Sequence, residues 1–261
     1  METTVNGLKI NYEIAGEGPW LTLSHSLACD LHMWDEQMDA LTKKYKVLRY
    51  DTRGHGKSAA PAGAYTLDEL ASDVHGLLTA LNIKRTHWAG LSMGGMIGQT
   101  FALNYPGVFQ SMVLADTTSR YPAEAAAAWE DRIKTAQSKG MEAVVDGTLA
   151  RWFTEPYRQA NPPALARVGA SIRNTPVAGF VGCCHAIPKI NLTHRLKEIE
   201  CPTLVIVGEQ DPGTPVAMAR EIHEAKPGSK LVIIPSAAHL SNIEQPQAFT
   251  AAMVDFLGSV K

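Results

Sequence analysis

Short apolar runs, separated by longer segments of mixed character, occur along most of the chain. Each run is bounded by glycine, proline or polar residues, as is typical of strands buried in a parallel sheet. A different pattern comes first, because residues 7–15 alternate polar and apolar side chains, which predicts an opening strand exposed on one face. The buried strands are predicted at residues 20–23, 47–50, 87–89, 112–115, 202–208 and 230–234.

The segments between these strands carry apolar residues at helical spacing. Between Thr66 and Asn82, leucine, alanine and valine recur every three or four residues, which predicts a helix with one apolar face. Strand and helix therefore alternate, and this order implies a parallel sheet joined by right-handed crossovers. Further helices are predicted at residues 34–41, 96–105, 216–225 and 246–257.

The alternation stops between residues 121 and 192. This stretch is rich in alanine, and its prolines at 156, 162, 163 and 176 divide it into about four short predicted helices. We expect a helical cap, residues 121–192, inserted between a first core part, residues 1–120, and a second, residues 193–261. The predicted fold class is α/β, with a mostly parallel central sheet flanked by helices.

The composition of the chain argues against some classes of binding partner. The chain is 45% apolar, which is enough for a large core, and its formal net charge is −2. No basic tract suggests nucleic acid, and no stretch approaches the roughly 20 apolar residues that span a bilayer. The four cysteines lack paired spacing, so we expect free thiols and a cytoplasmic protein, either alone or as a homo-oligomer.

One pentapeptide suggests the chemistry. Gly90-Leu91-Ser92-Met93-Gly94 lies between an apolar strand and an apolar helix, and it matches the G-x-S-x-G nucleophile elbow. In this motif a strand turns sharply into a helix, so that the serine is strained and its hydroxyl stands above the sheet. The flanking glycines leave room for that turn.

A serine nucleophile needs a base and an acid to orient the base. His239 follows the last predicted strand, and Asp211 follows the strand before it. Asp116 is an alternative acid because it also follows a core strand and precedes the histidine. We favour Asp211, since the order Ser92, Asp211, His239 is that of the α/β-hydrolase fold.

The same geometry predicts an oxyanion hole. One donor is the backbone amide after the nucleophile, at Met93, and the other comes from the loop after an early strand, at Leu27. Because the amides make these contacts, the two side chains are free to line the pocket.

The sequence gives less support to metal catalysis and to phosphate binding. No His and Cys cluster has metal-ligand spacing, so no metal is expected. The glycine-rich loop at residues 51–58 lacks the spacing of a phosphate-binding loop and is interpreted as structural, and His25 receives no chemical role. A serine at the elbow favours attack on a carbonyl, and hence acyl transfer to water.

Several segments together resemble the α/β-hydrolases and, within them, the 3-oxoadipate enol-lactonases. The elbow and the loop at residues 49–56 are common to many hydrolases, whereas the segments of the insertion and of the histidine loop are more specific. The segments that carry the resemblance are residues 26–27, 30–35, 49–56, 90–95, 151–154, 182–184 and 238–246. The chain departs from the lactonases at residues 186–191, where it has a proline in place of an acidic stretch.

The resemblance implies a cofactor-independent carboxylic ester hydrolase that opens an enol-lactone to 3-oxoadipate, in the β-ketoadipate pathway of aromatic catabolism. It also implies a triad of Ser92, Asp211 and His239. The substrate is a small anion, which requires a cationic partner. Arginines 132, 151, 167 and 173 of the insertion are the candidates for that partner, and the expected substrate contacts are Ser26, Trp129, Arg132 and Trp152.

Two other interpretations remain. The same residues could act on another ester, on a carbon–carbon bond of a ring-cleavage product, or in peroxide-dependent chemistry. The fold also serves as a small-molecule receptor without turnover. A substrate panel separates the first group, and a burst without a steady-state rate would indicate the second.

Overall fold

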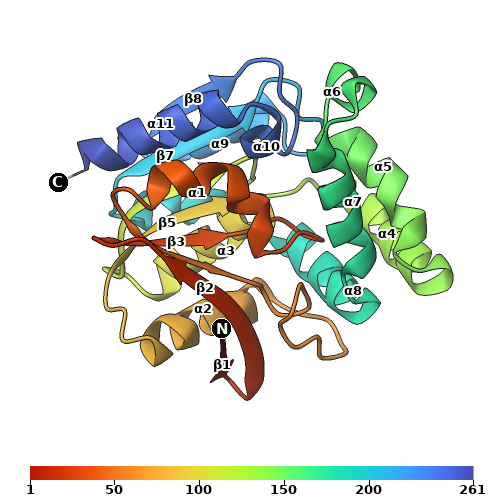
Figure 1. Ribbon diagram of the computed structural model, residues 1–261, viewed down its shortest axis with the longest axis horizontal. Coiled ribbons are helices and arrows are strands. Elements are labelled where there is room, and N and C mark those ends of the chain that lie inside the picture. The colour runs from red at the N-terminus through yellow and green to blue at the C-terminus, as the bar shows by residue number, and fades with distance from the viewer. Residues whose placement is uncertain (261) are drawn as a thin grey trace.

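The computed structural model describes residues 1–260, and an eight-stranded sheet runs through its centre (Figure 1). The strand order is β1-β2-β4-β3-β5-β6-β7-β8. Strands β3 to β8 pair in parallel, whereas β1 and β2 pair antiparallel at one edge. The strands are β1 Glu2–Val5, β2 Leu8–Ala15, β3 Trp20–Ser24, β4 Lys46–Tyr50, β5 Thr86–Leu91, β6 Phe109–Ala115, β7 Thr203–Gly208 and β8 Lys230–Ile234.

The predicted α/β class with a mostly parallel sheet is confirmed, but the first strand was missed. Strand β1 is a short edge strand of mostly polar residues, so it has no apolar pattern. Asn6-Gly7, with φ angles of 50° and 77°, makes the tight turn from β1 into β2. This dipeptide was the sequence signal from which β1 could have been predicted. The one-sided exposure expected for β2 is also wrong, because Ile10, Asn11 and Tyr12 are all buried between β1 and β4.

Helices cover both faces of the sheet. On one face α1 packs against α11, and on the other α2 packs against α3 (Figure 1). Helix α2 begins where the sequence predicts because Thr66 and Glu69 form a capping box. These helices are α1 Asp35–Leu41, α2 Leu67–Ala80, α3 Met93–Asn104, α9 Val216–Ala225, the short α10 Ser241–Glu244 and α11 Pro246–Ser259.

Between β6 and β7, five helices lie together beside the sheet (right in Figure 1). The expected number was about four. Gly140, with φ 75°, ends the first helix and was not recognised, whereas Pro156 lies in the first turn of a helix, where proline is tolerated. The helices are α4 Ala125–Lys139, α5 Glu142–Trp152, α6 Glu155–Ala160, α7 Pro163–Asn174 and α8 Val177–Ala186.

The backbone of helix α8 lies in direct contact with the backbone of residues 54 and 65. A Cβ atom added at Gly179 would lie 2.0 Å from the carbonyl oxygen of Gly54. Tyr65 also donates its amide to the carbonyl of Gly182, at 3.0 Å. The divergent segment after α8 forms a short 3-10 turn, Ile187–Lys189, and returns to the core through a bridge between Arg120 and Asn191. The proline is therefore accommodated in a turn.

The glycine-rich loop at residues 51–58 is structural, as predicted. Asp51 accepts hydrogen bonds from the amides of Leu31 and Lys57, each at 2.9 Å, and Arg53 pairs with the buried Asp73. All four cysteines are free thiols. Within residues 1–260, no helix combines the length and apolar character needed to cross a bilayer.

Candidate active site

Ser92 lies at the turn between β5 and α3 in a strained conformation, with φ 55° and ψ −114°. The turn needs its glycines, because a Cβ atom at Gly90 would lie 2.1 Å from the carbonyl oxygen of Gly94. The amide of Ser92 donates to Ala115, and its carbonyl accepts from the Thr117 hydroxyl at 2.7 Å. The end of β6 therefore holds the elbow from both sides.

The imidazole of His239 connects Ser92 with Asp211. Its Nε2 atom lies 2.9 Å from Ser92 Oγ, and its Nδ1 atom lies 2.7 Å from Asp211 Oδ2. Since an ionised carboxylate can only accept, Nδ1 carries the proton and Nε2 accepts from the serine hydroxyl. All three side chains are buried. This is the arrangement of a nucleophile, a base and an orienting acid.

Asp211 is held as an ionised group. Its Oδ1 atom accepts the amides of Gly213 and Thr214, and its Oδ2 atom accepts the Thr214 hydroxyl at 2.6 Å. Burial by itself favours the neutral acid, but the charge of His239 and these donors outweigh it and lower the pKa of Asp211. The carboxylate can therefore balance a positive charge on the imidazole.

Asp116, the alternative acid, has different partners. Its carboxyl group accepts the amide of Gly208 at 2.7 Å and the hydroxyl of Ser241 at 2.5 Å, and it forms no hydrogen bond with His239. Burial, followed by the nearby charge of Asp211, raises the pKa of Asp116 to about 8. At neutral pH Asp116 is therefore mainly the neutral acid, and it joins the loops that carry Asp211 and His239.

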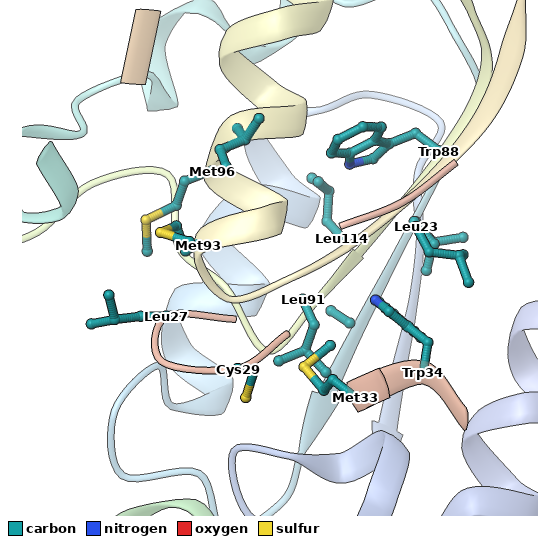
Figure 2. Packing of buried hydrophobic residues seen from close by; sticks show 14 of the residues in the cluster. Leu23, Leu27, Cys29, Met33, Trp34, Trp88, Leu91, Met93, Met96 and Leu114 are labelled. Atoms are coloured by element: carbon teal, nitrogen blue, oxygen red, sulfur yellow. The ribbon is translucent and has the colours of Figure 1, made fainter. Parts of the chain in front are cut away.

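The expected oxyanion donors are the amides of Leu27 and Met93. The segment before Leu27 packs against the start of α3, since a Cβ atom added at Gly94 would lie 2.3 Å from the carbonyl oxygen of Ser24. Figure 2 shows the loop of Leu27 passing the first residue of that helix, Met93. Among residues 1–260, neither amide donates to another protein group. Both are therefore free to receive an anion near Ser92 Oγ.

Two buried histidines shape that loop. His55 Nε2 accepts the amide of Ala28 at 2.9 Å, and His25 Nε2 accepts the amide of Thr52 at 3.0 Å. Burial, with the neighbouring His25, lowers the pKa of His55 to about 3, so the ring stays neutral and can accept. His25 has a structural role here, as expected.

A cavity of about 200 Å³ opens above Ser92 and His239. Ser26 and Leu27 line one side, and the helical insertion supplies the opposite wall. The Trp152 ring stacks near His239, with ring centroids 6.1 Å apart, and the Arg132 guanidinium lies 4.3 Å from the centroid of the Trp129 ring. The cavity therefore combines apolar walls with positive charge.

The four expected substrate contacts, Ser26, Trp129, Arg132 and Trp152, all line this cavity. Of the other candidate arginines, Arg151 also lines it, whereas Arg167 and Arg173 pair with glutamates elsewhere. The polar lining residues Tyr121 and Thr148 were not predicted, and neither were the apolar Phe180 and Ile187. Thr148 precedes Arg151 by three residues and Trp152 by four on α5, so these two expected residues were the signal for Thr148.

Comparison with known proteins identifies the family. The sequence profile of the alpha/beta hydrolase fold family matches residues 19–246. The chain belongs to the α/β-hydrolase family. As an α/β-hydrolase it is a hydrolytic enzyme, and the sheet and flanking helices described above are those of the family.

Relatives of this α/β-hydrolase include lactonases. It is 35% identical to 3-oxoadipate enol-lactonase 2 of Acinetobacter baylyi, over 96% of this chain and 93% of the relative. The crystal structure of the enol-lactonase from Burkholderia xenovorans LB400 superposes with a TM-score of 0.96 at 40% identity, and the match covers 99% of this chain and 100% of the other. RutD of Pseudomonas savastanoi, assigned as a carbamate hydrolase, is 30% identical over 93% of this chain and 95% of its own.

Proposed function

We propose that this α/β-hydrolase opens the ring of 3-oxoadipate enol-lactone to give 3-oxoadipate, a step of the β-ketoadipate pathway. The hydrogen-bonded series Ser92, His239, Asp211 carries the proposal, because it opens into a cavity with two arginines and two tryptophans. The enol-lactonases among its relatives support this choice of substrate. The proposal places the enzyme in the cytoplasm, where the four cysteines would remain thiols.

The first half of the reaction forms an acyl-enzyme. His239 Nε2 takes the proton of Ser92 Oγ, and the oxygen attacks the lactone carbonyl. The amides of Leu27 and Met93 donate to the resulting oxyanion, and Asp211 stabilises the imidazolium. The ring carbon–oxygen bond then breaks, and its electron pair leaves with the enolate oxygen. The imidazolium of His239 gives its proton to this leaving group, and the enol that forms tautomerises to the ketone, so that His239 is neutral again.

The second half repeats the cycle with water. His239 deprotonates a water molecule, which attacks the acyl carbon, and the serine oxygen leaves with the proton from the imidazolium. In this proposal residues 121–192 act as a cap that excludes bulk water. Trp129 and Trp152 would then contact the ring, Ser26 would line the floor, and Arg132 would bind the acetate arm of the substrate.

Arg132 gives a specific test of substrate binding. We expect Arg132→Gln to lower kcat/KM for the enol-lactone by roughly 10- to 100-fold, mainly through KM, because a charge-assisted hydrogen bond to the carboxylate is lost. The measurement is the loss of ultraviolet absorbance by the lactone. Arg167→Gln, which removes a cap arginine paired with Glu36, serves as the matched control. An equal loss in both variants would contradict the assignment.

The pH dependence gives a second test. Burial disfavours a charged His239, but the charge and hydrogen bond of Asp211 outweigh it, so the pKa of His239 lies above its ordinary value of 6.5. The base must be neutral to accept the serine proton, so activity is lost as the pH falls through this raised pKa. We expect the acid limb of kcat/KM to have its midpoint above pH 6.5, and a midpoint below 6 would contradict the proposed base.

The RutD relative makes carbamate hydrolysis the second candidate. Both reactions would use the same nucleophile and oxyanion hole, so they differ only in which substrate the cavity accepts. Purified protein assayed with the enol-lactone, a carbamate, a simple ester and a ring-cleavage diketone would separate them. Turnover of the carbamate with no turnover of the lactone would overturn the lactonase proposal.

A further inference from the structure

Two arginines line the cavity from neighbouring helices. Arg132 extends from α4 and Arg151 from α5, and α4 and α5 pack against each other. Among residues 1–260, neither guanidinium pairs with a carboxylate. Arg151 donates only to the Thr148 hydroxyl, at 3.3 Å, and Arg132 lies over the Trp129 ring. The cavity wall therefore carries two positive charges without a protein counter-charge.

The acidic side chains nearby do not compensate for these charges. The carboxylates of Glu130 and Asp131 on α4 and of Asp146 on α5 are exposed to solvent, outside the cavity. Asp211 at the cavity floor is already bound to His239 and Thr214. The Tyr121 phenol and the Cys184 thiol close to Arg132 are neutral, because burial raises the pKa of both groups.

The positive charges of Arg132 and Arg151 repel each other. Burial, followed by the charge of Arg132, lowers the pKa of Arg151 to about 10. Arg151 keeps its charge at neutral pH, because this pKa still lies well above neutrality, so the cavity wall holds an unfavourable excess of positive charge. Of the three other arginines in residues 121–192, Arg167 and Arg173 each pair with a glutamate, and Arg158 donates to the carbonyl of Phe153 outside the cavity. Arg132 and Arg151 are thus the two that line the cavity above Ser92, and neither has a carboxylate partner.

We propose that Arg132 and Arg151 together form a dianion site, and that its ligands are short dicarboxylates. The inference rests on the proposed function and extends it, because the enol-lactone has a single carboxylate. Arg132 would bind that group in the substrate. Arg151 would meet a second negative charge that exists only later in the reaction.

The second charge arises as the ring opens. When the ring carbon–oxygen bond breaks, its electron pair stays on the enolate oxygen, and after attack by water the acyl carbon leaves as a carboxylate. Two guanidinium groups therefore bind the ring-opening transition state and the dianionic product more strongly than the singly charged lactone. Such differential binding accelerates the chemical step and also predicts inhibition by the product.

The test uses a neutral substrate, so that it does not depend on lactonase activity. Hydrolysis of 4-nitrophenyl acetate is followed in the presence of adipate or hexanoate. Both acids have six carbons, but adipate carries two carboxylates and hexanoate carries one. We expect adipate to inhibit competitively with an inhibition constant at least about 10-fold below that of hexanoate, and the preference to fall as salt is added. Equal inhibition by the two acids would overturn the proposal.

The variants assign the preference to residues. Arg151→Gln is expected to remove most of the preference for adipate, Arg151→Lys to keep part of it, and Arg173→Gln, which removes an arginine paired with Glu142, to leave it intact. Circular dichroism confirms that each variant is folded, and calorimetric titration with adipate measures binding directly. A preference that survives in folded Arg151→Gln would contradict the role of this residue. Adipate preference without lactone turnover would leave the dianion site standing and overturn the proposed substrate instead.

Discussion

Ser92→Ala is expected to abolish turnover of the enol-lactone, with a loss on the order of 10⁴- to 10⁶-fold in kcat. The hydroxyl removed is the one that contacts His239 Nε2 at 2.9 Å, and no other side chain in the cavity occupies that position. The loss is measured as the rate of decrease of lactone absorbance at saturating substrate.

The fold is expected to survive this substitution. Alanine keeps the Cβ atom of serine, so the strain at φ 55° is unchanged, and the backbone bonds of residue 92 with Ala115 and Thr117 remain. The melting temperature should stay close to that of the wild type. Ser138→Ala, which removes an exposed serine of α4, is the matched control and should retain full activity. Retained turnover in Ser92→Ala would refute the acyl-enzyme mechanism.

The two buried acids should respond very differently to the same substitution. Asp211→Asn is expected to lower kcat by about 10⁴-fold, because an amide can donate to His239 Nδ1 and so favour the tautomer that cannot accept from Ser92. Asp116→Asn is expected to cost less than about 10-fold at neutral pH. A neutral amide can replace a neutral acid there, since its oxygen accepts from Gly208 and its nitrogen donates to Ser241.

Assays of both variants side by side decide which acid orients the base. Parallel melting curves show whether either loss reflects unfolding. A larger loss in Asp116→Asn than in Asp211→Asn, with both proteins folded, would reverse the assignment. The comparison is sensitive because the two carboxyl groups are both fully enclosed and differ mainly in whether they touch His239.

Local chemistry explains most of what could be predicted. The strands from β3 onward are continuous apolar runs, and buried parallel strands require such runs. The elbow could be recognised because a strand-to-helix turn around Ser92 needs small residues on both sides, and Gly90 and Gly94 would each collide with backbone if they carried a Cβ atom. The errors in the fold occurred where the local signal was brief, at Asn6-Gly7 and at Gly140.

The order of the chain placed Ser92, Asp211 and His239 at one edge of the sheet but left Asp116 as an alternative acid. Both aspartates follow a core strand in the sequence, so their positions along the chain do not distinguish them. The choice between them depends on which carboxyl oxygen lies 2.7 Å from His239 Nδ1 and on how burial and neighbouring charge set each pKa. These quantities exist only once the loops after β6, β7 and β8 are packed together.

The sequence by itself therefore determined the sheet, the elbow and the small set of residues able to perform acyl transfer, because periodicity and turn chemistry act between near neighbours. Only the tertiary structure decided which face of α4 and α5 meets the catalytic serine. Trp129, Arg132, Arg151 and Trp152 share one cavity with Ser92 because the two helices that carry them pack against each other. Contacts between residues far apart in the chain define the charge of that cavity, and hence the ligand it can hold.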